Sequence, residues 1–219
     1  MKNIKGVIFD LDGTLIDSMW MWGVVARRYL ICQGAEPRVD LESVLRSFNT
    51  VEEATYYKTE YGVALPLEEI IAGRNRMMMD FFCNEVELKP GVIEFIRLLH
   101  RFGVRMCIAT ATERELVEPA VHRFGLMEHI ERIFTCDEEN TSKINPDIYI
   151  RAAEYMGTDI GNTLVVEDAL YAIKTAKKAG FIVAGVYDLS SDDLQEDIIR
   201  VCDHYWKDLK EALSCFTIN

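Results

Sequence analysis

The sequence predicts an α/β fold, in which a doubly wound parallel sheet forms the core and a small all-helical segment is inserted after the first strand. Two observations predict it. Short apolar runs alternate with amphipathic stretches of about ten residues along most of the chain, which is typical of βαβ units. Between residues 18 and 86, in contrast, the chain carries helical signals alone.

Short, nearly continuous apolar runs are the predicted strands. Runs of this length and composition are typical of parallel strands that are buried on both faces. They occupy residues 4–9, 104–109, 132–135, 163–166 and 181–186.

The helices predicted between these strands carry start or stop signals. The helix at residues 90–102 has Pro90 near its start and Gly103 just past its end, which is the usual placement of these two residues. Three more helices, each followed by a glycine, are predicted at residues 113–124, 146–156 and 169–179.

The inserted segment is predicted to contain three helices. Ser18 is expected to cap a first helix that continues to Gln33. Thr50 and Glu53 have the spacing of a capping box, which predicts the start of a second helix. Pro66 is expected to open the third.

These patterns predict two domains. Residues 1–16 and 87–219 are expected to form the α/β core, and residues 17–86 the helical insert. The methionine run at residues 77–79 is expected to pack in the interior of the insert, because methionine fills irregular gaps in apolar cores.

Composition and charge exclude several classes of partner. The chain has 24 Lys and Arg residues and 36 Asp and Glu residues. The resulting net charge of −12 repels nucleic-acid phosphates. No apolar run reaches the roughly 18 residues that a membrane span needs, and we expect no signal peptide. Six cysteines without a CxxC pair favour a reducing compartment. We therefore expect a cytoplasmic monomer or homodimer with neither nucleic-acid nor membrane partners.

Acidic residues follow two of the predicted strands. Asp10 and Asp12 come after the first strand, with Gly13 permitting a sharp turn, and Glu167 and Asp168 follow residues 163–166. Ligands of parallel sheets gather at the carboxyl ends of the strands, where crowded carboxylates are costly without a cation. Mg²⁺ prefers such oxygen ligands. An isolated Asp-x-Asp-Gly would instead be read as a solvated turn.

Two further segments complete the pattern. Thr110 and Thr112 follow the strand at 104–109, and their hydroxyls and amides can bind an oxyanion, although a helix cap has the same pattern. Lys143 lies just before a helix that begins with Pro146. Opposite four carboxylates, a lysine becomes a plausible partner for both their charge and a phosphate group.

In this order, these residues resemble the four motifs of the haloacid dehalogenase-like hydrolase superfamily. The corresponding positions are residues 10–14, Thr110, Lys143 with Pro146, and Glu167 with Asp168. The insert resembles the small helical cap of the phosphatase and beta-phosphoglucomutase branch. The resemblance covers essentially the whole chain and implies a Rossmann-like core.

The resemblance implies a Mg²⁺-dependent phosphatase that hydrolyses a small phosphorylated metabolite through an aspartyl-phosphate intermediate. Asp10 would be the nucleophile. Asp12 would protonate the leaving oxygen and then activate water, and Lys143 would bridge Asp10 and the phosphate. These three are the catalytic residues that the resemblance implies.

The resemblance also implies two sets of ligands. The phosphoryl group would be bound by Leu11, Asp12, Thr110, Ala111 and Lys143. Mg²⁺ would be bound by Asp10, the backbone carbonyl of Asp12, and Asp168, with Glu167 behind them or bound through water.

Departures from the family pattern blur the subfamily but remove no charged catalytic group. They are Ala111, Ser142, Ile144, Ala169 and Ala172. Two alternatives stay open, namely a sugar-phosphate mutase of the beta-phosphoglucomutase type and a non-catalytic binding or regulatory module with the same fold. Dehalogenase and phosphonatase activities are disfavoured because Asp12 is present.

Selectivity for the rest of the substrate is expected from the insert, because the core motifs recognise only the phosphoryl group. The candidates are Asp17, Trp20 and Trp22 near its start and Arg46, Ser47 and Asn49 in a later connection. The alternative is that the tryptophans pack in the interior of the insert and that Arg46 is solvated.

Overall fold

The computed structural model describes residues 3–45, 48 and 50–216. Two compact units make up the chain, one of Met1–Met19 with Val86–Asn219 and one of Trp20–Glu85. Of the candidates for selectivity, Arg46, Ser47 and Asn49 lie outside the described residues, so their role stays a prediction.

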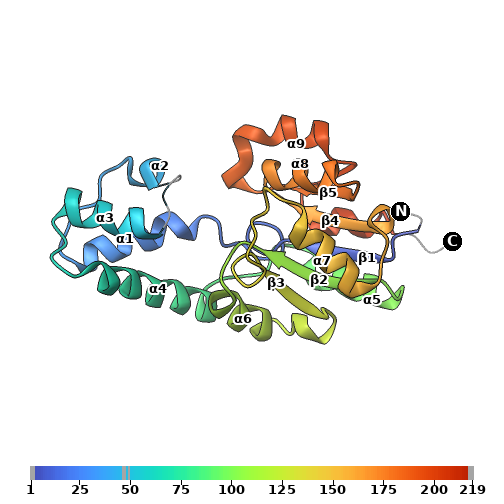
Figure 1. Cartoon of the computed structure of the whole chain (residues 1–219), viewed down its shortest axis with the longest axis horizontal. Coiled ribbons are helices and arrows are strands. Elements are labelled where there is room, and N and C mark those ends of the chain that lie inside the picture. The colour runs from blue at the N-terminus through green and yellow to red at the C-terminus, as the bar shows by residue number, and fades with distance from the viewer. Residues whose placement is uncertain (1–2, 46–47, 49, 217–219) are drawn as a thin grey trace. The chain divides into compact units, whose positions relative to one another are not determined.

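A six-stranded parallel sheet is the centre of the first unit (Figure 1), which confirms the predicted α/β class. Its order is β3-β2-β1-β4-β5-β6, the doubly wound order in which the winding reverses beside β1. The strands are β1 (Gly6–Phe9), β2 (Arg105–Thr110), β3 (Arg132–Thr135), β4 (Thr163–Glu167), β5 (Ile182–Val186) and β6 (His204–Trp206).

The sequence did not predict β6. This strand has three residues, and His204 and Tyr205 are only half-buried, so no apolar run marks it. It forms because its backbone pairs with β5 in parallel, with Ala184 opposite His204 and Val186 opposite Trp206.

Helices cover both faces of the sheet. Neighbouring residues of a strand point to opposite sides, so Ile8 and Phe9 of β1 report on the two faces. Ile8 belongs to a buried cluster that includes Ile148 of α7 and Ile173 of α8. Phe9 lies edge-on against Phe95 of α5, with 6.1 Å between ring centroids. The helices are α5 (Val92–Arg101), α6 (Arg114–Arg123), α7 (Asp147–Met156), α8 (Leu170–Lys178), α9 (Gln195–Val201) and α10 (Leu209–Leu213), with 3₁₀ turns η1 (Leu126–Glu128), η2 (Ile160–Asn162) and η3 (Leu189–Leu194).

The second unit is helical along its described residues. It contains α1 (Met21–Cys32), α2 (Leu41–Leu45), α3 (Thr50–Tyr61) and α4 (Leu67–Asn84). Its interior is a cluster of buried side chains that includes Tyr29, Leu30, Leu41, Tyr57 and Ile70. Among the described helices of the whole chain, none combines the length and the apolar content that a membrane crossing requires.

The prediction that Ser18 caps the first helix of the insert is wrong. Helix α1 begins only at Met21, and its N-cap residue is Trp20. The Ser18 hydroxyl instead donates a hydrogen bond to Asp12 Oδ1, over 2.6 Å. A buried carboxylate is the stronger acceptor, so it takes the hydroxyl that would otherwise satisfy a helix end.

A buried ion pair joins α3 to α4. Helix α3 begins where the capping box predicted, but the Glu53 carboxylate accepts hydrogen bonds from Arg74 Nε, 3.1 Å away, and from the Tyr57 hydroxyl. The Arg74 guanidinium lies 5.2 Å from the centre of the Trp22 ring. Trp20 packs edge-on against Phe81 at 5.2 Å. Both tryptophans therefore have packing partners within the insert.

We predict that Arg74→Ala destabilises the insert strongly. The Arg74 and Glu53 side chains are each only 10% exposed, and removing one partner leaves a buried charge unpaired, which costs about 3 kcal/mol or more. The matched control is Arg38→Ala. It breaks an ion pair to Glu60 whose side chains are 53% and 43% exposed, and we expect a much smaller loss of stability, because water screens exposed pairs. Urea unfolding followed by circular dichroism measures both, and equal losses would contradict the prediction.

Candidate active site

The candidate site lies at the carboxyl edge of the sheet, around its central strand. Asp10 directly follows β1, and Thr110 is the last residue of β2. Glu167 is the last residue of β4, and Asp168 is the next residue in the chain. Strand β1 lies between β2 and β4, at the point where the winding reverses and where doubly wound folds bind their ligands. The sheet thus brings together residues that are far apart in the sequence.

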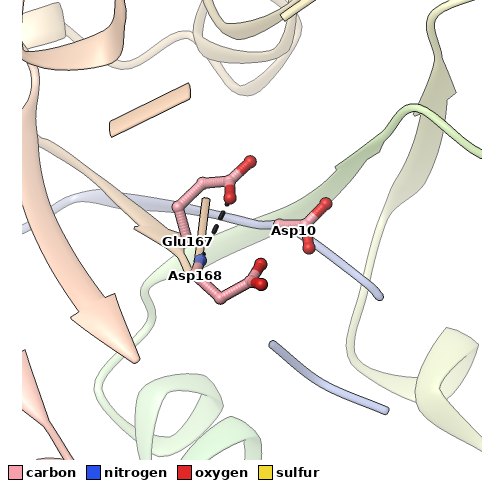
Figure 2. A group of neighbouring side chains, drawn as sticks. All are labelled: Asp10, Glu167 and Asp168. Carbon is pink, nitrogen blue, oxygen red and sulfur yellow. Dashed lines mark hydrogen bonds between the residues drawn. The ribbon is translucent and has the colours of Figure 1, made fainter. Parts of the chain in front are cut away.

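Three buried carboxylates meet at this edge (Figure 2). Asp10, Glu167 and Asp168 each offer an oxygen atom, and these atoms lie within 4.8 Å of one another. The backbone amides of Asp168 and Ala169 both donate to Glu167 Oε2, over 3.1 Å each. Glu167 is thereby fixed at the turn that leads from β4 into α8.

Lys143 is the cation that faces this cluster. Its ammonium donates to Asp10 Oδ1 and, over 2.6 Å, to Glu167 Oε1, and only 4% of the residue is exposed. The Tyr149 hydroxyl donates to the same Glu167 oxygen over 3.1 Å. Within the described part of the chain, one buried ammonium therefore faces three carboxyl groups.

Burial, together with this imbalance of charge, shifts the pKa values of the cluster. Burial raises the pKa of Asp10 to about 8, with Lys143 opposing the shift and Glu167 adding to it. Burial and the charges of Glu167 and Asp10 also raise the pKa of Asp168 well above its usual range. Burial lowers the pKa of Lys143, but Asp10 and Glu167 outweigh it and keep the ammonium protonated.

The donor set fits a hard divalent cation. Carboxylate oxygens are the ligands that Mg²⁺ prefers, and a dication would offset the negative charge that Lys143 leaves unbalanced. Both oxygens of Glu167 already accept hydrogen bonds from Lys143, Tyr149 and backbone amides. This leaves Asp10 and Asp168 as the carboxylates with the more available oxygens.

Asp12 has a different environment from Asp10. Its carboxylate accepts hydrogen bonds from the hydroxyls of Ser18 at 2.6 Å, Thr112 at 2.8 Å and Thr110 at 3.5 Å. Burial raises its pKa although these hydrogen bonds oppose the shift. Two carboxyl groups held differently by their neighbours can perform different acid–base tasks.

The other predicted phosphate-binding residues differ in what they offer. Thr110 Oγ1 accepts a hydrogen bond from the Thr112 amide over 3.1 Å and points to Asp12. Leu11 is fully buried and has no polar side-chain atom, and its carbonyl accepts hydrogen bonds from the amides of Leu15 and Ile16. Ala111 is exposed at the start of the loop that follows β2.

Sequence reasoning missed several residues that hold the site together. The sequence pattern predicts Ser18 as a helix cap and Thr112 as an oxyanion ligand, whereas both hydroxyls donate to Asp12. Tyr149 lies in the first turn of α7, and only the packing of that helix against β1 and β2 brings its hydroxyl to Glu167. Contacts of this kind depend on tertiary structure and leave no local signal.

Comparisons with known proteins identify similar hydrolases. The family model described as haloacid dehalogenase-like hydrolase matches residues 7–186. A (DL)-glycerol-3-phosphatase 2 of Arabidopsis thaliana is 30% identical over 210 residues, which cover 90% of this chain and 87% of that protein. The mitochondrial (DL)-glycerol-3-phosphatase 1 of the same plant is 31% identical over 87% of this chain and 66% of its own length.

Solved structures share the fold. A crystal structure of CbbY from Rhodobacter sphaeroides in complex with phosphate superposes with a TM-score of 0.77 over 95% of this chain and 96% of that one. At 22% sequence identity, this likeness concerns the fold alone.

We predict that Asp10→Asn stabilises the metal-free protein more at pH 8 than at pH 5. The pKa of Asp10 rises from its usual 3.8 to about 8 in the folded state. Folded Asp10 therefore binds more protons than unfolded Asp10, and its contribution to stability is lost as the pH rises through this window.

Thermal unfolding in a chelator at both pH values measures this effect. We expect the gap between the melting temperatures of Asp10→Asn and wild type to widen by several degrees, since about 1 kcal/mol corresponds to roughly 2–4 °C at this chain length. The control is Asp193→Asn, the same change at an exposed acid. A gap that is equal at both pH values would contradict the assignment.

Proposed function

The chain belongs to the haloacid dehalogenase-like hydrolase family, and we propose that it is a Mg²⁺-dependent phosphatase that acts through an aspartyl phosphate on Asp10. Phosphate-ester hydrolysis is the activity that the family and the relatives support. The observation that carries the proposal is the contrast between the two acids. Asp10 is paired with the Lys143 ammonium, whereas Asp12, two residues further, is held by hydroxyls.

In the first step, an Asp10 carboxylate oxygen attacks the phosphorus of the substrate. The bond between phosphorus and the ester oxygen breaks, and the Asp12 carboxyl group gives its proton to that leaving oxygen. Lys143 fixes the orientation of Asp10 and offsets negative charge on the transferring group. The raised pKa of Asp12 supports its role as the proton donor, whereas the charges of Lys143 and of a bound dication would lower the pKa of Asp10 and favour its carboxylate.

In the second step, water releases the phosphate. The Asp12 carboxylate, now without its proton, takes one from a water molecule whose oxygen attacks the phosphorus. The bond between Asp10 and phosphorus breaks, inorganic phosphate leaves, and both acids return to their starting states. Splitting hydrolysis into two displacements lets one buried site serve both.

The remaining site residues would bind the phosphoryl group and the metal. We propose that the phosphoryl oxygens are bound by the Thr110 hydroxyl, by Lys143 and by backbone amides of Leu11, Asp12 and Ala111. Asp10, Asp168 and the backbone carbonyl of Asp12 would hold Mg²⁺, with Glu167 supporting Lys143. When bound, the metal would neutralise charge on the phosphoryl oxygens.

We propose a small phosphorylated metabolite as substrate, by analogy with the glycerol-3-phosphatases. The helical insert would act as the cap that selects it, since lids commonly complete such pockets. The net charge of −12 and six free cysteines support a cytoplasmic protein, as monomer or homodimer, without a nucleic-acid partner. Isomerisation of a sugar phosphate without phosphate release would instead support a mutase. If the protein neither hydrolysed a phosphate ester nor isomerised a sugar phosphate, a non-catalytic binding or regulatory module would be supported.

Asp10→Asn should abolish turnover. The variant keeps the shape of the side chain but removes the attacking charge, so we expect phosphate release from p-nitrophenyl phosphate to fall by about three orders of magnitude or more. Asp193→Asn is the control and should keep wild-type activity. Near-full activity of Asp10→Asn would refute the covalent mechanism.

Removal of divalent cations should both inactivate and destabilise the protein. We expect no phosphate release in EDTA, recovery with Mg²⁺, and a gain of about 2.7 kcal/mol in stability at a hundred times the dissociation constant. Asp168→Asn should lose most of this gain, whereas Asp193→Asn should keep it. Undiminished turnover of the EDTA-treated protein would rule out metal dependence.

A further inference from the structure

Lys89 connects its own segment to the turn that follows β1 and to the segment that follows β5, beside the candidate site. Its ammonium donates to the backbone carbonyl of Gly13 over 2.6 Å, to that of Tyr187 over 2.7 Å and to Asp188 Oδ2 over 2.8 Å. An ammonium has three donors, and these oxygens use all of them. The side chain is only 10% exposed. Lys89 therefore holds the protein's own backbone and has no donor left for a substrate.

Asp188 is a fixed acceptor for this lysine. The amide and the hydroxyl of Ser190 donate to its other oxygen, over 2.9 and 2.7 Å. Burial would raise the pKa of Asp188, but the hydrogen bonds from Lys89 and Ser190 hold it below its usual range. The segment that follows β5 thus offers Lys89 a rigid, charged anchor.

Through the same ammonium, Lys89 holds the turn that contains Asp12. Gly13 has a left-handed backbone with φ +83°, and a Cβ placed there would lie 2.6 Å from Asp168 Oδ2. The next hydroxyl, that of Thr14, donates to Asp168 Oδ1 over 3.4 Å. The turn therefore packs directly against Asp168, and any shift of Gly13 would change the positions of Asp12 and Asp168 relative to each other.

The backbone of Lys89 contacts the end of the same turn. Its amide donates to the Leu15 carbonyl, and the Asp17 amide donates to the Glu87 carbonyl, both over 2.9 Å. Lys89 thus binds residue 13 through its side chain and residue 15 through its backbone. Both contacts lie within the α/β unit.

We propose that Lys89 is a positioning residue for phosphoryl transfer, which holds the turn from Leu11 to Leu15 so that Asp12 meets the leaving oxygen. This role rests on the proposed function, because it concerns the Asp12 proton transfer. A displacement of about 1 Å in such a group can cost about a hundredfold in rate.

Lys89→Met in the full-length protein tests this role. With p-nitrophenyl phosphate and saturating Mg²⁺, we expect kcat to fall by about ten- to a hundredfold while KM changes by less than about threefold. The matched control is Lys177→Met, which removes another lysine–aspartate pair, to Asp203 near the start of β5. Its kcat should stay within about twofold of wild type.

Hydrogen exchange provides a readout that does not depend on activity. The amides of Leu15 and Ile16 donate to the Leu11 carbonyl over 2.9 and 3.0 Å, so they report on the closure of the turn. We expect faster exchange at residues 11–16 in Lys89→Met and unchanged exchange there in Lys177→Met. If Lys89→Met does not fold, Lys89→Gln, whose amide can still donate to one carbonyl, serves in the same comparison.

Three results would overturn the inference: a Lys89 variant with kcat within about twofold of wild type, an equal loss of kcat in Lys177→Met, or unchanged exchange in the turn. A wild-type protein that releases no phosphate would defeat the proposed function, and the inference would fall with it. A wild-type protein that is active beside a fully active Lys89 variant would defeat the inference alone.

Discussion

The candidate site depends on a buried imbalance of charge. Asp10, Glu167 and Asp168 meet at the carboxyl edge of the sheet, and Lys143 is the ammonium that contacts two of them. Isolated charges are costly to bury, so the folded chain must either bind protons at this edge, as the raised pKa values of Asp10 and Asp168 indicate, or bind a cation. A site that takes up positive charge in this way is also suited to phosphoryl groups, whose binding brings further negative charge.

The rest of the α/β unit holds these groups in place. Asp10 and Glu167 sit at the ends of adjacent parallel strands, so the register of β1 and β4 fixes their separation. The turn that follows Asp10 contacts the segment that contains Lys89. The Lys89 ammonium binds Gly13 of this turn and Asp188 of the segment after β5. Asp10 and Glu167 thus lie at a sheet edge fixed by strand pairing, and Asp12, the proposed proton donor, lies on a turn that Lys89 contacts at residues 13 and 15.

The fold class could be predicted from the sequence, because the apolar runs of buried parallel strands and the glycines after the helices are local signals. Asp10, Glu167 and Asp168 could be expected to meet, since each follows or ends a predicted strand, whereas Lys143 precedes a helix and was expected beside them through the order of the motifs. The sequence could not show that Ser18 and Thr112 donate hydrogen bonds to Asp12, because serine and threonine hydroxyls are also common in helix caps. Strand β6 depends on its pairing with β5 and on the packing of Trp206 against Phe95, and the contacts of Lys89 span 76 and 99 residues, so neither has a local pattern.

The most direct test of the central claim is to find where the phosphoryl group goes during turnover. The wild-type protein would be mixed with excess substrate and Mg²⁺, quenched in acid within milliseconds, digested, and examined by mass spectrometry. The account predicts an acid-stable, alkali-labile phosphoryl group on the peptide that contains Asp10, present only in the quenched reaction. Turnover at the wild-type rate with no phosphoryl group on that peptide, or with one on another residue, would contradict it.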